Sequence, residues 1–133
     1  MALTRAQGVA GTPAYIAPEQ ATGEGALDGR ADLYALGCVG YWLLTARHVF
    51  GATSGIKMIV AHVNDTPEPP SHHTEMPVPP DLDALILSCL EKDPASRPAT
   101  AEDLIAALDG ITFDDPWSPA RAAEWWQVHK QPE

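Results

Sequence analysis

Basic residues are scarce in this sequence. Of its 133 residues, 8 are Lys or Arg and 18 are Asp or Glu, which gives a formal net charge of −10. Proteins that bind the phosphate backbone of nucleic acid need a positive face that displaces counterions. The composition therefore argues against nucleic acid as a partner.

A long apolar run is also missing. The longest uncharged stretch lies between Asp32 and Arg47, which is shorter than the roughly 18 apolar residues that a membrane-spanning helix requires. Met1 is followed by ALTRAQ, which has neither the apolar core nor the cleavage site of a signal peptide. We expect no membrane span and a cytoplasmic location.

Cysteine is rare, and no metal-ligand pattern stands out. Cys38 and Cys89 lie within apolar helical patterns, which favours two reduced, buried thiols over a disulfide or a metal pair. His72 and His73, with Glu75 nearby, lack a third ligand at the spacing of a typical metal site. We predict no bound metal.

Apolar residues make up 45% of the chain, enough for one core. Their spacing is helical, without convincing strand alternation, so we predict an all-α fold. A short turn is expected after Pro18, and longer helices are expected at 31–45, 54–63, from 81 to before Pro94, 100–110, and from 118 onward. The predicted N-terminal caps are Ser54, Asp81, Thr100 and Ser118.

The helix at 31–45 is apolar on every face, so it is expected at the centre of the fold, buried by neighbours on all sides. The later helices each carry one apolar stripe that we expect to be buried. These stripes consist of Ile56, Ile59, Val60 and Val63; of Leu82, Leu85, Ile86, Cys89 and Leu90; and of Ala101, Leu104, Ile105 and Leu108.

Three motifs occur in a fixed order: GTPAYIAPE at 11–19, DLYALG at 32–37 and KDPASRP at 92–98. Together with the apolar helix and the Pro-rich stretch between them, they resemble the C-terminal lobe of a Ser/Thr protein kinase, and most of all its bacterial branch. The resemblance covers residues 3 to about 110. It implies a helical C-terminal lobe whose N-terminal lobe and catalytic loop are absent.

The resemblance also divides the chain into three parts. Residues 1–30 correspond to the downstream half of the activation segment and the substrate-binding loop. Residues 31–110 correspond to the helical core of the lobe, and 111–133 form a tail with a short Trp-containing helix.

Two charged residues stand alone among prolines and apolar residues, Glu19 and Arg97. Both are candidates for a buried ion pair, because a buried charge requires a partner, although two ordinary surface charges are the alternative from the residues alone. The resemblance favours the pair and implies that it anchors the activation segment to the helical lobe. Asp32 is predicted to anchor the start of the central helix, where a carboxylate complements the free N–H groups and the dipole. Its partner in the family is the catalytic loop, so we expect Asp32 to lack a partner at a buried site.

The resemblance implies that one loop contacts the peptide substrate. Its residues are Gly11, Thr12, Pro13, Ala14 and Tyr15. Thr12 would help to position the accepting hydroxyl, although a Thr that stabilises a turn is the alternative interpretation. Thr4 and Thr12 are candidate phosphorylation sites, since a phosphate can order such a segment where a base such as Arg5 reaches it.

Phosphoryl transfer requires groups that bind Mg²⁺, a Lys on the phosphates and a base for the hydroxyl. The Gly-rich loop, the strand Lys, the His-Arg-Asp loop and the Asp-Phe-Gly motif do not occur in these residues. We therefore assign no catalytic residue and expect no cofactor on this chain, whereas the complete family enzyme uses ATP and Mg²⁺.

Two interpretations of function follow. In the first, the chain is part of an ATP-dependent Ser/Thr kinase, with Met1 internal to a longer reading frame or the other half supplied separately. In the second, it is a non-catalytic helical module derived from a kinase lobe that binds a partner through its exposed face. The expected partners are a protein substrate or the missing N-terminal half of the kinase.

Overall fold

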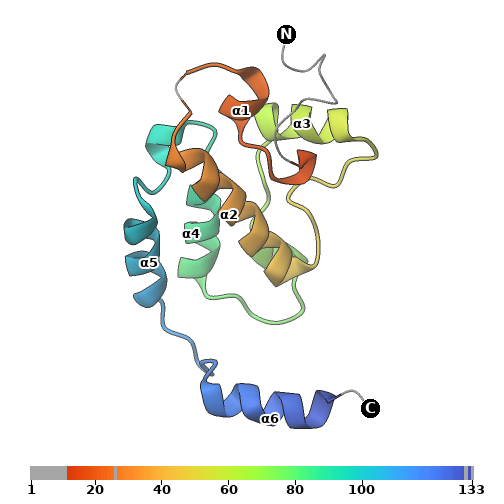
Figure 1. Ribbon diagram of the computed structural model, residues 1–133, viewed down its shortest axis with the longest axis vertical. Helices are drawn as coiled ribbons and strands as arrows, with labels where there is room; N and C mark the ends of the chain where they lie inside the picture. Colours follow the sequence, from red (N-terminus) through yellow and green to blue (C-terminus); the bar gives the residue numbers. More distant parts are fainter. Residues whose placement is uncertain (1–11, 26, 131, 133) are drawn as a thin grey trace.

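The computed structural model describes residues 12–25, 27–130 and 132, and this part of the chain is all-α without a strand, as predicted. Figure 1 shows the central helix α2 with α4 and α5 along one side and α1 and α3 near its other side. The helices are α1 (Pro18–Thr22), α2 (Gly29–Thr45), α3 (Gly55–Asn64), α4 (Pro80–Cys89), α5 (Ala101–Asp109) and α6 (Pro119–His129). Short 3-10 turns are η2 (Pro13–Tyr15), η3 (Pro70–His73) and η4 (Pro94–Ser96).

Three of the predicted caps are confirmed. The side chain of Ser54 accepts a hydrogen bond from the backbone N–H of Lys57, and Thr100 and Ser118 make the same type of contact three residues ahead. Each oxygen satisfies one N–H group that has no partner within the helix. These three helices therefore begin where local side-chain chemistry places them.

The predicted cap of α4 is wrong. The helix begins at Pro80, and Asp81 lies within its first turn. Proline suits this first position because it has no N–H to satisfy and its φ is already helical. Asp83 instead accepts hydrogen bonds from the backbone N–H and the hydroxyl of Ser71, which ties the Pro-rich connection to α4.

The main core lies where α2 packs against α4. Tyr34, Cys38 and Tyr41 on α2 are fully buried together with Leu90 at the end of α4. The two helices approach closely at Gly37, where an added Cβ would lie 2.7 Å from the Cβ of Cys89. Both cysteines are buried free thiols.

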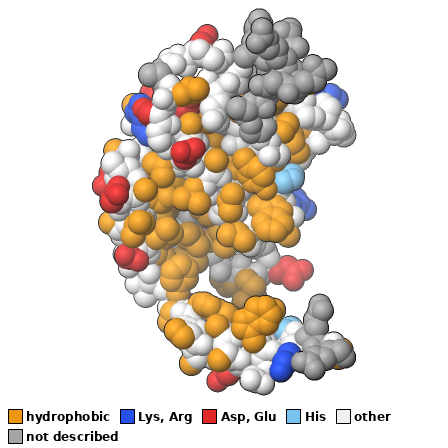
Figure 2. All heavy atoms as spheres, viewed as in Figure 1, with side chains coloured by type: hydrophobic (Ala, Val, Ile, Leu, Met, Phe, Trp, Pro, Cys, Tyr) orange, Lys and Arg blue, Asp and Glu red, His pale blue; other side chains and the backbone are white. Residues whose placement is uncertain are grey.

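One face of α2 is exposed, so the prediction that this helix is buried on every side is wrong. Leu36 is 50% exposed and Leu43 is 70% exposed, and Val39 and Trp42 are also exposed. With α4 and α5, this face lines an apolar groove of about 280 Å³. Figure 2 shows the hydrophobic side chains that gather on this side of the molecule and again on α6.

The apolar stripes of the outer helices are only partly buried. On α3, Ile59 is buried and Val63 packs beside it, whereas Ile56 and Val60 are exposed. On α5, Leu104 is buried while Ile105 and Leu108 are exposed, because α5 is packed mainly against α4.

Helix α6 lies apart from the other helices (Figure 1). Its Trp125 and Trp126 are exposed, and their rings pack edge to face with each other. No helix in the described residues combines the length and apolarity needed to cross a membrane.

Candidate functional site

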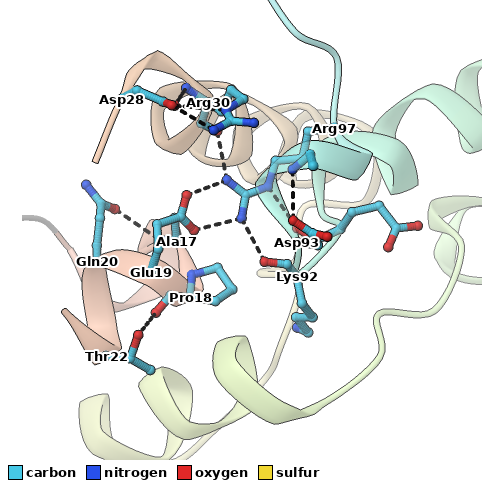
Figure 3. Close-up of polar contacts among 12 residues, drawn as sticks. Ala17, Pro18, Glu19, Gln20, Thr22, Asp28, Arg30, Lys92, Asp93 and Arg97 are labelled. Atoms are coloured by element: carbon cyan, nitrogen blue, oxygen red, sulfur yellow. Dashed lines mark hydrogen bonds and ion pairs between the residues drawn. The ribbon is translucent and has the colours of Figure 1, made fainter. Parts of the chain in front are cut away.

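The structure brings Glu19 and Arg97 together, although 78 positions separate them in sequence. The Arg97 guanidinium donates from Nη1 to Oε2 and from Nη2 to Oε1 of Glu19, both at 2.7 Å (Figure 3). Both residues are buried. A bidentate geometry is the strongest arrangement available to this pair, because two parallel charge-assisted hydrogen bonds fix both planes.

The other N–H groups of Arg97 bind backbone carbonyls. Nε donates to Glu91 O at 2.8 Å, Nη1 to Arg30 O at 3.0 Å and Nη2 to Lys92 O at 3.3 Å. The guanidinium also lies over the ring of Tyr34, 4.9 Å from its centroid. Arg97 therefore joins α1, the first turn of α2 and the loop after α4.

Local chemistry positions both partners of the pair. Glu19 stands in the first turn of α1, where the side chain of Gln20 accepts a hydrogen bond from the N–H of Ala17. Gly23 then ends α1 in the left-handed conformation, at φ 71°, which a residue without Cβ adopts at no cost. On the other side, the carboxylate of Asp93 accepts from Ala95 N and caps the turn that leads to Arg97.

Burial and hydrogen bonding shift the pKa of Glu19 in opposite directions. Burial raises the pKa of the Glu19 carboxyl, but the hydrogen bonds and the charge of Arg97 outweigh it and leave the pKa below its usual value. The carboxylate is therefore ionised at neutral pH, and the pair is a true ion pair.

The loop that the resemblance assigns to substrate is described from Thr12 onward. The carbonyl of Thr12 accepts a hydrogen bond from the N–H of Tyr15 at 2.9 Å, which closes turn η2, and Thr12 itself is exposed. Ala14 is buried, and the Tyr15 ring packs edge to face with His48 at 5.8 Å. Gly11 and Thr4 lie outside the described residues.

A buried histidine, which the sequence did not single out, contacts this loop. Nε2 of His62 lies 3.0 Å from Ala14 O, and Nδ1 lies 2.6 Å from the hydroxyl of Tyr34. Lys92 Nζ donates to the carbonyl of His62 at 2.8 Å. Burial lowers the pKa of His62 to about 4, against the opposite effect of the hydrogen bond to Ala14. The signal available in the sequence was a histidine flanked on both sides by apolar residues of α3.

Asp32 does not occupy the buried site that was expected. It lies in the first turn of α2 with an exposed side chain, so it carries no desolvation cost. Asp28 caps the helix by accepting from Arg30 N at 2.9 Å, and its carboxylate also binds the Arg30 side chain. Because Arg30 supplies one of the carbonyls that hold Arg97, this cap belongs to the same cluster.

The hydrogen bonds of this cluster hold backbone segments in place. Its carboxylates are occupied by Arg side chains or helix caps. In the described residues, no group of three or more His, Cys, Asp or Glu side chains could hold a metal ion. This arrangement can fix the position of the loop at 12–15 relative to the helices.

The sequence that contains this cluster is similar to known proteins. The protein kinase domain family matches residues 2–107. The chain is 42% identical over 111 residues to the serine/threonine-protein kinase pkn3 of Myxococcus xanthus, which covers 83% of this chain and 20% of that kinase. It is 41% identical over 119 residues to the serine/threonine-protein kinase PknB of Mycolicibacterium smegmatis, covering 86% of this chain and 19% of PknB.

The PknB of Mycobacterium tuberculosis is 39% identical over 114 residues, covering 86% of this chain and 18% of that protein. The chain thus spans about a fifth of the length of the relatives that it matches. The three sequence motifs lie within the matched residues, and two of them contribute Glu19 and Arg97. By the extent of this match, the chain belongs to the protein kinase domain family.

Proposed function

We propose that this chain is the helical, substrate-binding part of a Ser/Thr protein kinase domain. In the complete enzyme, the loop at 11–15 contacts the protein substrate and the pair of Glu19 and Arg97 holds that loop on the helical lobe. The observation that carries the proposal is this buried bidentate pair, whose two members come from the kinase-like motifs.

The exposed apolar face of α2 supports the same proposal. Leu36 and Leu43 are more exposed than is usual for residues on a central helix. A surface of this kind normally meets another protein surface. The other part of the kinase domain is the partner that family membership implies.

ATP and Mg²⁺ belong to the complete family enzyme. This sequence contains neither a Gly-rich loop nor an Asp-Phe-Gly motif to hold them. The described residues do not fit either group, and this chain by itself is proposed to be inactive. The reaction of the complete enzyme would transfer a phosphoryl group from ATP to a Ser or Thr hydroxyl.

A hybrid kinase tests the proposal. The part of PknB from Mycolicibacterium smegmatis that precedes its match would be joined to this chain at residue 2. The hybrid is expected to transfer labelled phosphate from ATP to Ser- or Thr-containing peptides. Intact PknB serves as the positive control, and this chain alone is expected to give no transfer.

The Arg97→Ala version of the hybrid provides a matched variant, and it should lose transfer because the loop is no longer anchored. A hybrid that folds, as judged by circular dichroism, but transfers no phosphate while intact PknB is active would contradict the proposal.

A second candidate function is a non-catalytic interaction module, and the apolar groove between α2, α4 and α5 favours it. A module of this kind should be as stable alone as when it is joined to the rest of a kinase, whereas part of a domain should be less stable alone because its apolar face is uncovered. Thermal unfolding of the chain and of the hybrid distinguishes the two. Equal melting temperatures, together with an inactive hybrid, would favour the module.

A further inference from the structure

His62 occupies an unusual position for an ionisable residue. Its side chain is 1% exposed, and it lies on α3 where that helix packs against turn η2, with its ring in contact with Tyr34 of α2. Both ring nitrogens have partners on segments distant in sequence, Ala14 at 48 positions and Tyr34 at 28 positions. The ring therefore connects three segments that the chain brings together only on folding.

The hydrogen bonds define which nitrogen carries the proton. A backbone carbonyl can only accept, so the N–H of His62 must be on Nε2 and point to Ala14 O. Nδ1 is then an acceptor, and the buried hydroxyl of Tyr34 donates to it. A neutral imidazole satisfies both contacts, whereas a second proton on Nδ1 would make the Tyr34 hydroxyl the acceptor and leave the proton of that hydroxyl without this partner.

Two aromatic rings pack against the imidazole of His62. Phe50 packs edge to face against it at 5.0 Å, and the ring of Tyr34 does so at 5.6 Å. Lys92 holds the backbone of the same residue through the His62 carbonyl and lies over the Phe50 ring. The carbonyl of Ala14 is thereby fixed to a rigid part of the helical lobe.

We infer that His62 is a positioning residue, which holds turn η2 in the conformation that receives the protein substrate. The role of His62 toward substrate rests on the proposed function, whereas its anchoring of the loop rests on the geometry alone. Arg97 holds the segment that follows the loop, at Glu19, and His62 holds the loop itself at Ala14. The two anchors act on different residues of this segment, and both contact Tyr34 and Lys92.

Two substitutions separate the two contacts of His62. Gln can place an amide N–H near the position of Nε2 and keep the bond to Ala14, whereas Asn can place an oxygen near Nδ1 and keep only Tyr34. In this chain, hydrogen exchange of the Tyr15 amide reports on η2, because that N–H donates to Thr12 O. We expect faster exchange in His62→Asn and near-normal exchange in His62→Gln.

The nitrogen chemical shifts of the imidazole provide an independent reading. We expect the tautomer protonated on Nε2 in the wild-type chain. A ring that averages between tautomers, a Tyr15 amide that is unprotected in the wild type, or equal exchange in the Asn and Gln variants would overturn the anchoring role.

The hybrid kinase measures the role toward substrate. His62→Asn should raise the KM for a protein substrate about tenfold, the effect of losing roughly one hydrogen bond, and leave the KM for ATP unchanged. The KM for the protein substrate should stay close to the wild-type value in His62→Gln. Ile86→Val, in the core between α2 and α4, is the control for loss of stability alone and should change neither KM.

The outcomes are distinguishable. An inactive wild-type hybrid would refute the proposed function and with it the substrate role, while the exchange measurement would still decide the anchoring. An active hybrid in which His62→Asn changes both KM values equally, or lowers only the amount of folded protein, would overturn the positioning role.

Discussion

Replacing Arg97 with Ala should remove a large part of the stability of the fold. The substitution removes five hydrogen bonds, two to Glu19 and three to backbone carbonyls. It leaves the carboxylate of Glu19, 8% exposed, without its counterion. Breaking a buried pair in this way costs about 3–5 kcal/mol, which is a large part of the 5–15 kcal/mol that typically stabilises a domain.

Urea unfolding followed by far-ultraviolet circular dichroism measures this loss. The free energy of unfolding of Arg97→Lys should lie between those of the wild type and Arg97→Ala, because one ammonium group cannot make the bidentate contact and reach the same carbonyls. The double variant Glu19→Gln with Arg97→Met should be more stable than Arg97→Ala, since neither substitution leaves a buried charge.

Arg121→Ala is the matched control. Arg121 pairs with Asp115 at 3.2 Å on the exposed tail, and such surface pairs contribute about 0–1 kcal/mol. If Arg97→Ala changed the free energy of unfolding by no more than Arg121→Ala does, the buried pair would not stabilise the fold and the reasoning would be refuted.

Three further predictions concern other sites. The free energy of unfolding should fall by up to about 3 kcal/mol as the pH drops from 6.5 to 4, because the pKa of His62 is lowered to about 4 in the folded chain and the unfolded chain takes up the proton first. Urea unfolding at a series of pH values should show a smaller fall in His62→Gln. Gly37→Ala should cost about 1–3 kcal/mol of stability and lower the melting temperature, since the new methyl group would overpack against Cys89. An unchanged melting temperature would show that α2 and α4 can separate freely. Ala46→Gly should raise stability by up to about 1 kcal/mol, because this residue ends α2 at φ 56°, in the left-handed region that costs a side chain energy; a loss of stability would refute this.

Features set by neighbouring residues could be predicted from the sequence. The caps at Ser54, Thr100 and Ser118 depend on a side chain and an N–H three residues later, so a short window contains both partners. The contact between Glu19 and Arg97 could be anticipated for another reason, because the two isolated charges were candidates for a buried pair and the resemblance to protein kinases favoured it.

Features set by distant partners could not be predicted. The stripe on α3 correctly marked Ile59 as buried, yet Val60 of the same stripe is exposed, because no described element covers that side. Helix α2 looked buried on every face for the same reason, since hydrophobicity shows what a helix can bury and not what is present to bury it. His62 was missed because its two partners lie 28 and 48 positions away.

The contact between Glu19 and Arg97 also bears on how the chain reaches its folded state. It closes a loop of 78 positions, and the entropy cost of such a closure must be met before the contact stabilises anything. The neighbouring helices can form their local contacts first, so the pair is expected to form after the rate-limiting step. Weakening it should then leave the folding rate almost unchanged and accelerate unfolding, which makes Arg97 a determinant of how long the folded chain persists.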